Sequence, residues 1–294
     1  MKLHRNVKKI GCDKMKLLLV DGSNLLFQMF FGMPARIVNK DGKAIQGTLG
    51  FVGALLKIIR MVKPTHVAVL FDGESENPRV ALDGNYKANR EDYSEVSEEE
   101  NPFSQLPDID AALDYLGICH AETTDCETDD WMAGYVKRYA GKPLEIVISS
   151  FDSDFFQLIS DKVKILRYRG ENTVICDEVY LKEKFGIVPS QYAEFKSLTG
   201  DTADNIKGAD KVGPKTAAQL MNEFGSLDSM IARAAEIKKP SIRESVKNNA
   251  ERIWKNYKLI HLDGADDLPF DLNEMIFTDC DLTTTEVLRG IGLK

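Results

Sequence analysis

Cysteine, histidine and tryptophan are scarce in this 294-residue chain, which has 5, 4 and 2 of them respectively. The cysteines are widely scattered and never stand in CxxC spacing: Cys12, Cys119, Cys126, Cys176 and Cys280. An odd, unpatterned set predicts neither a disulfide framework nor a zinc knuckle, and it fits a reducing cytoplasm.

Long hydrophobic runs and an excess of positive charge are missing as well. The apolar run at residues 17–20 is too short for a signal sequence or a membrane span, so we expect no membrane association and interpret residues 1–14 as an arm before Met15. The 38 basic and 46 acidic residues give a net charge of −8, which argues against nucleic-acid binding over the whole surface. A local basic face beside an acidic metal site remains compatible with this charge.

What the sequence does contain is an alternation of strand and helix patterns. Short apolar strands are predicted at residues 16–20, 66–71, 118–120 and 145–149, with helical patterns between them. This rhythm predicts an α/β fold with a mostly parallel central sheet and helices on both faces. We expect this core to span residues 15–185, ending in a hairpin and a helix. Residues 186–294 are predicted to form a helical subdomain, with helices at 214–224 and 245–262.

Acidic residues follow the predicted strands. In a parallel sheet the carboxyl ends of the strands share one edge, where ligands bind. Nine carboxylates from five segments can meet there: Asp21, Asp72, Glu127, Asp129, Asp130, Asp152, Asp154, Asp201 and Asp204. Any one of them can be a turn former or a helix N-cap, but nine together would raise one another's pKa values unless cations intervene. Oxygen ligands without nearby His or Cys favour Mg²⁺ or Mn²⁺ over zinc.

A glycine-punctuated turn at residues 208–213 follows the last acids and leads through Pro214 into a helix. Lys215 and Thr216 fall in the first turn of this helix. The free N–H groups and the positive dipole end of such a helix favour a phosphate.

Six motifs in this order resemble the 5′-nuclease family, which includes the N-terminal domain of bacterial DNA polymerase I and the phage and cellular flap endonucleases. They are VDGSN, VLFDG, NYKANR, ETDD, SSFDSDFFQL and GDTADNIKGADKVGPKTA. The match covers about residues 16–227 and continues more loosely to about 271. It implies a PIN-like core and a helix-three-turn-helix at about 203–225 that grips duplex DNA. It also implies two Mg²⁺ or Mn²⁺ ions about 4 Å apart, which activate a water and stabilise the leaving oxygen, and a K⁺ ion at the turn.

The resemblance also assigns roles to residues. Asp21, Asp72, Glu127 and Asp129 match the first metal cluster, and the other five acids match the second. Residues 74–105 match the arch, or gateway, for a single-stranded 5′ end. Its later half departs from the family by being acidic (Glu91, Asp92, Glu95, Glu98, Glu99, Glu100), and we expect that half to face solvent.

Basic residues near the arch and the turn complete the expected site. Lys87, Arg90 and Lys196 match basic residues near the scissile phosphate, and Tyr86 is expected to stack on a base. The expected DNA-binding set is Tyr86, Lys87, Arg90, Lys207, Gly208, Lys211, Gly213, Lys215 and Thr216. For Lys87 and Lys196, the alternative is ordinary solvated surface charge.

The sequence therefore predicts a free-standing, monomeric, structure-specific 5′-nuclease. Its expected substrates are DNA flaps, nicks, recessed 5′ ends and RNA-primed ends in lagging-strand replication and repair, with no polymerase domain after residue 294. One alternative is a DNA-junction-binding module without turnover, which an Asp21→Ala control would distinguish. The other is a metal-dependent ribonuclease of related sheet architecture.

Overall fold

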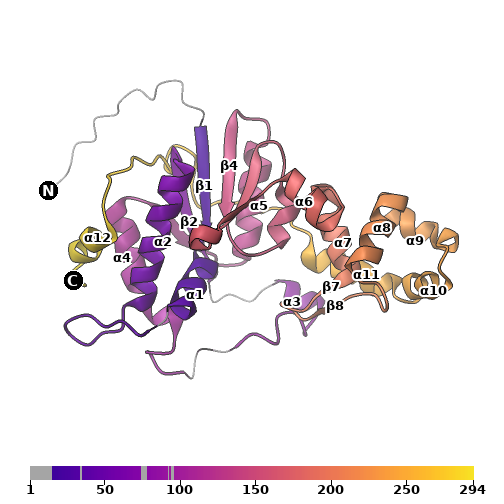
Figure 1. Cartoon of the computed structure of the whole chain (residues 1–294), viewed down its shortest axis with the longest axis horizontal. Coiled ribbons are helices and arrows are strands. Elements are labelled where there is room, and N and C mark those ends of the chain that lie inside the picture. Colours follow the sequence, from indigo (N-terminus) through magenta and orange to yellow (C-terminus); the bar gives the residue numbers. More distant parts are fainter. Residues whose placement is uncertain (1–14, 34, 74–77, 92, 94–95) are drawn as a thin grey trace.

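A computed structural model describes residues 15–33, 35–73, 78–91, 93 and 96–294. The predicted arm at residues 1–14, the start of the arch at residues 74–77, and two of the six acids named in its later half, Asp92 and Glu95, lie outside the described residues. Figure 1 shows a central sheet with helices on both sides and a helical region extending from one side.

The central sheet has six strands in the order β3-β2-β1-β4-β5-β6. The strands are β1 (Met15–Asp21), β2 (His66–Phe71), β3 (Cys119–Glu122), β4 (Leu144–Ser149), β5 (Val163–Arg167) and β6 (Val174–Cys176). All neighbours pair in parallel except β6, which is antiparallel to β5. The predicted mostly parallel sheet and its terminal hairpin are confirmed.

Helices cover both faces because the central strands are apolar on both. In β1, Leu17 and Leu19 belong to the core cluster that includes α5 (Thr128–Tyr139) and α6 (Glu178–Phe185). The alternate residues Leu18 and Val20 pack with α1 (Gly22–Gly32), α2 (Gln46–Val62) and α4 (Leu106–Leu116). Since successive side chains of a strand point to opposite faces, an unbroken apolar run is buried from both sides.

The C-terminal half contributes the helical subdomain on the right of Figure 1. Its helices are α7 (Tyr192–Thr199), α8 (Pro214–Phe224), α9 (Leu227–Ala232), α10 (Pro240–Asn248) and α11 (Ala250–Ile260). The single helix predicted at 245–262 was wrong. The chain leaves the helix at Asn249 (φ −110°, ψ 10°), whose side-chain amide donates to the Ser245 carbonyl at 2.7 Å. Asn commonly competes with helical hydrogen bonding in this way.

The end of the chain returns to the core. Ile276 forms a bridge with His66 beside β2, and α12 (Thr284–Gly290) packs against α2 and α4. In Figure 1 this helix lies at the opposite end of the molecule from α8, α9 and α10. Among the described residues, no helix has the length and apolar character needed to cross a membrane.

Candidate metal centre and nucleic-acid interface

The strand order places the acids at the switch point of the sheet. From β1 the chain moves outward through β2 and β3, and then returns to the other side of β1 as β4. Ligands bind in the crevice where the direction reverses in this way. Asp21 ends β1 there and caps α1, accepting a hydrogen bond from the Asn24 amide at 2.9 Å. The Ser150 hydroxyl donates to the other oxygen of Asp21 at 2.7 Å.

Neighbouring segments add three more carboxylates. Asp72 follows β2 and accepts from the backbone amide of Thr128 at 2.9 Å, which ties it to the start of α5. Asp129 lies in the first turn of α5. Asp152 follows β4 and accepts from the Asp154 amide at 2.7 Å. Together with Asp21, these carboxylates line one cavity of about 550 Å³.

These four acids have no basic partner within ion-pair distance in the described part of the chain. Burial raises the pKa of Asp21 to about 7, and the neighbouring Asp72 adds to the shift. Burial and then the charge of Asp152 raise the pKa of Asp129. Like charges that lie close together around the buried Asp21 resist ionisation, so the cavity favours cations.

The other five acids each have a basic partner from the chain itself. Arg79 of α3 (Pro78–Leu82) donates to Glu127 at 2.5 Å and to Asp130 at 2.7 Å. Lys87 also pairs with Glu127, and Arg90 donates to Asp204 at 3.1 Å. The ammonium group of Lys196 pairs with Asp154 and Asp201.

The expected grouping of the acids therefore changes. Asp152, expected in the second cluster, lines the cavity of the first, whereas Glu127 and Asp130 point to Arg79. Arg79 was missed by the sequence interpretation. It lies in a stretch without clear periodicity, and nothing in its spacing indicates that it would meet α5.

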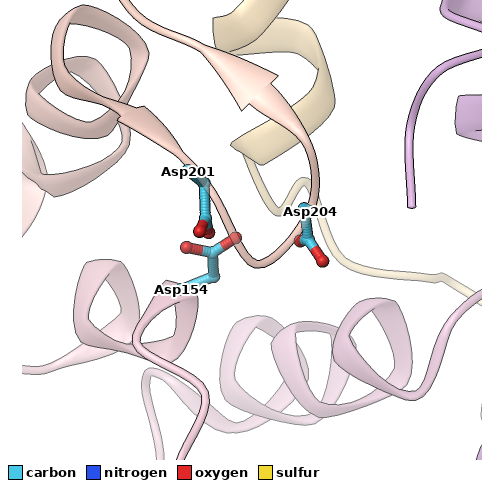
Figure 2. A group of neighbouring side chains, drawn as sticks. All are labelled: Asp154, Asp201 and Asp204. Atoms are coloured by element: carbon cyan, nitrogen blue, oxygen red, sulfur yellow. The ribbon is translucent and has the colours of Figure 1, made fainter. Parts of the chain in front are cut away.

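Asp154, Asp201 and Asp204 form a second group of oxygens. One carboxylate oxygen from each lies within 4.8 Å of the others. Figure 2 shows the three side chains converging from two segments, a short helical turn that begins at Asp154 and the loop that carries Asp201 and Asp204. This loop connects β7 (Gly200–Asp201) to β8 (Ile206–Lys207).

The base of the arch, residues 85–90, is hydrogen-bonded to that same loop. The Lys87 amide donates to the Asp204 carbonyl at 3.1 Å, and the Asn205 side chain donates to the Asn85 carbonyl at 2.8 Å. Lys87 and Arg90 therefore stand at the cavity that the four acids line. Both basic residues line this cavity, and each is paired with an acid.

The expected base-stacking role of Tyr86 is contradicted. Its side chain is 6% exposed and packs with Ile206, Leu259 and Ile260 of the helical subdomain. Its hydroxyl donates to Glu127 at 3.2 Å. Tyr86 is a core residue that joins the arch base to the subdomain, so its ring has no face open to a base.

Aromatic and acidic residues form the outer wall of the cavity. Phe27, Tyr93 and Phe103 line it, with ring centroids 5.3–6.0 Å apart. Glu98, Glu99 and Glu100 are exposed, which confirms that this part of the acidic half faces solvent. Glu91 is exposed too, and it also lines the cavity.

The glycine-punctuated turn at residues 208–213 joins β8 to α8. Lys207, Lys211, Gly213 and Lys215 are exposed, while Gly208 and Thr216 are half-buried. Gly213 caps α8 without a side-chain hydrogen bond, and Pro214 follows it. Lys207, Lys211 and Lys215 thus lie exposed along the segment from β8 to the first turn of α8, which follows the loop that carries Asp204.

Two protein-family models together match residues 16–283 of the chain. Residues 16–186 match the N-terminal resolvase-like domain of 5′-3′ exonucleases, and residues 187–283 match their C-terminal SAM fold. The chain belongs to the 5′-3′ exonuclease family. This family membership confirms the resemblance drawn from the six motifs.

Individual relatives are DNA polymerases. The chain is 34% identical to DNA polymerase I of Rhizobium leguminosarum over 264 residues, which cover 87% of this chain and 25% of that protein. It is 32% identical to the thermostable DNA polymerase I of Thermus thermophilus over 260 residues, covering 88% of this chain and 30% of that protein. The chain thus spans between a quarter and a third of the length of these two polymerases.

A solved structure shares the fold at lower identity. The bacteriophage T5 D15 flap endonuclease, solved as a pseudo-enzyme-product complex with DNA and metal ions, aligns with a TM-score of 0.68 and 23% identity. The alignment covers 84% of this chain and 89% of that one. It supports the arrangement of a PIN-like core with a helical subdomain.

Proposed function

We propose that this chain is a divalent-metal-dependent, structure-specific 5′-nuclease that hydrolyses DNA phosphodiesters near 5′ ends and single-strand/double-strand junctions. The observation that carries the proposal is the set of four carboxylates without a basic partner in the described residues, which line one cavity with Lys87 and Arg90. Membership of the 5′-3′ exonuclease family supports it.

The residues fit divalent ions. Asp21, Asp72, Asp129 and Asp152 would hold one ion, and the oxygens of Asp154, Asp201 and Asp204 offer a second position. Oxygen donors alone favour Mg²⁺ or Mn²⁺. When bound, such ions lower the pKa of a water and stabilise charge on the attacking and leaving oxygens.

The protein's own groups then bind and orient DNA. Lys87 and Arg90 reach the cavity, where their positive charge would bind a phosphate. To do so, Lys87 would leave Glu127 and Arg90 would leave Asp204, the carboxylates with which they now pair. The exposed turn at residues 208–213 and the start of α8 would bind duplex phosphates some distance from the reacting bond, with a K⁺ ion at the turn. Lys211, Lys215 and Thr216 are the residues that we assign to this contact.

The substrates that we propose are DNA with 5′ flaps, nicks or recessed ends, including RNA–DNA primer ends. Such a monomeric enzyme would act in Okazaki-fragment processing and repair in the bacterial cytoplasm. The identity to two bacterial DNA polymerases I and the fold shared with a flap endonuclease bound to DNA support this choice.

The test is cleavage of end-labelled 5′-flap, nicked, blunt and RNA-tailed duplexes with Mg²⁺, Mn²⁺ or EDTA. We expect cutting near the 5′ end or the junction that requires an ion and is lost in Asp21→Asn. The matched control Asp161→Asn changes an exposed acid before β5 and should leave cutting intact. Cutting in EDTA, or no cutting of any duplex with a 5′ end, would refute the proposal. Binding without turnover would favour a junction-binding module, and cutting confined to RNA would favour a ribonuclease.

A further inference from the structure

Lys196 is a buried lysine at the acidic centre. Its residue exposure is 7%, and it lies in α7, five residues before Asp201. Its ammonium group donates to the carboxylates of Asp154 and Asp201, and to the Ser153 hydroxyl at 3.2 Å. Three donors on an ammonium group are thus matched by three acceptors.

The oxygens that Lys196 contacts belong to the second carboxylate group. Asp154 and Asp201 are two of the three acids whose oxygens lie within 4.8 Å of one another, and Figure 2 shows their carboxylates facing each other. The third acid, Asp204, pairs with Arg90 instead. A positive charge from the chain therefore stands where these oxygens would otherwise hold an ion.

The buried ammonium group of Lys196 is held by direct ion pairs with both carboxylates. Asp154 is 6% exposed, so without Lys196 its charge would be buried and uncompensated.

We propose that Lys196 is a built-in counter-cation of the Asp154–Asp201 pair, which a divalent ion must displace in order to bind these oxygens. The inference rests on the proposed function and deepens it, because it makes the two ion positions unequal. Asp21, Asp72, Asp129 and Asp152 pair with no ammonium group in the described residues, because Lys87, which also lines their cavity, pairs with Glu127 instead. Their cavity therefore binds the tighter ion. The position at Asp154 and Asp201 binds the weaker one.

The displaced side chain has the means to move. Lysine carries its charge on a flexible four-carbon stem and acts as a point charge, so it can leave two carboxylates without disturbing their geometry. Removing the ammonium group of Lys196 should therefore destabilise the ion-free protein and favour the ion-bound protein. The ion-free protein loses a counter-charge, whereas the ion-bound protein no longer has to break two ion pairs.

The experiment compares Lys196→Met with wild type and with Lys164→Met, an exposed lysine in β5. Bound Mn²⁺ is counted by electron paramagnetic resonance and calorimetry without DNA. We expect wild type and Lys164→Met to bind one tight and one weak ion. In Lys196→Met the weak ion should bind at least about tenfold more tightly, or about 1.4 kcal/mol. Mn²⁺ should also raise the unfolding temperature more in Lys196→Met than in wild type, and Lys196→Arg should restore the wild-type pattern.

A second measurement needs no charge-removing variant. In wild-type protein with ¹³C-labelled lysine, the Lys196 Cε signal, assigned by its loss in Lys196→Arg, should shift along the weaker of two Mg²⁺ isotherms. An unmoved signal, or unchanged or weaker ion binding in Lys196→Met, would overturn the inference and leave the proposed nuclease intact. Absence of any ion binding would instead count against the nuclease proposal itself.

Discussion

Arg79 should be among the most important basic residues for the stability of this centre. Its side chain is 10% exposed and donates to Glu127 and Asp130, which belong to the N-terminal turn of α5. Replacement by Met keeps much of the side-chain volume but removes every donor. Asp130 would then lose its only ion-pair partner among the described residues, at 19% exposure, whereas Glu127 would keep Lys87 and the Tyr86 hydroxyl.

The magnitude follows from this difference. Breaking a fully buried ion pair costs about 3–5 kcal/mol. Because one acid keeps its other partners and the other is partly solvated, we expect about 2–4 kcal/mol for Arg79→Met. At about 2.1 cal/mol/K of unfolding entropy per residue, 294 residues give about 0.6 kcal/mol/K, so the unfolding temperature should fall by about 3–6 °C.

The assay is thermal and urea unfolding in EDTA, so that bound ions do not contribute. A double-mutant cycle with Asp130→Asn isolates the pair, with an expected coupling above about 1.5 kcal/mol. The matched control is Arg233→Met, which removes a 2.6 Å pair with Glu236 at 50% exposure and should cost much less, because solvent screens an exposed pair. Coupling below about 0.5 kcal/mol, or equal losses in Arg79→Met and Arg233→Met, would show that this ion pair does not stabilise the centre.

Three further predictions concern pH, duplex binding and the loop that carries Asp201. In EDTA the free energy of unfolding should fall as pH rises from 3.8 to about 7, because folded Asp21 keeps a proton that the unfolded chain has released. Asp21→Asn should remove about 2–3 kcal/mol of this decline between about pH 5 and about pH 8 in urea unfolding, and an unaltered decline would contradict the assignment. Lys215→Ala should weaken duplex binding and reduce the slope of log affinity against log salt by about 1, whereas Lys164→Ala should change neither. If Lys215→Ala instead lost metal binding and kept its DNA affinity, the roles assigned to the turn and to the acids would be reversed. Gly200→Ala should lower the unfolding temperature strongly, because Gly200 has φ +79° and a Cβ there would lie 2.4 Å from the Gly208 amide nitrogen. The control Gly141→Ala should be tolerated, because the space around Gly141 is open.

The elements that the sequence predicted well are those with sharp local signals. The bounds of β2 and α8 agree with the predicted ones, and the helix expected after the hairpin is α6. Gly186 ends α6 with φ 74°, a conformation that glycine adopts readily, and Pro214 begins α8. The prediction failed at Asn249 because that break depends on a side-chain hydrogen bond, which no periodicity reveals.

The nine acids could be predicted to gather because strand ends share an edge, but their partners could not be. Pairing depends on which way a loop side chain points. Lys87 has φ 56°, so the chain reverses there, and Tyr86 is directed into the core while Lys87 faces the acids. Tyr86 thus lies in the core and Lys87 at the cavity, although the two are neighbours in one motif. The sequence interpretation had assigned both of them to contacts with DNA.

The ion pairs also tie the assembly of the centre to the docking of separate elements. Arg79 comes from α3, Lys87 and Arg90 from the arch base, and Lys196 from α7. Their acidic partners lie on α5, on the turn after β4 and on the loop between β7 and β8. None of these elements carries both an acid of the centre and its basic partner, and mutual repulsion among unpaired acids opposes folding. The core and the helical subdomain therefore stabilise each other through charge as well as through the packing around Tyr86. The acids that remain without a basic partner after this docking are the ones that line the cavity, where we propose that the tighter ion binds, whereas the paired Asp154 and Asp201 would first have to release Lys196.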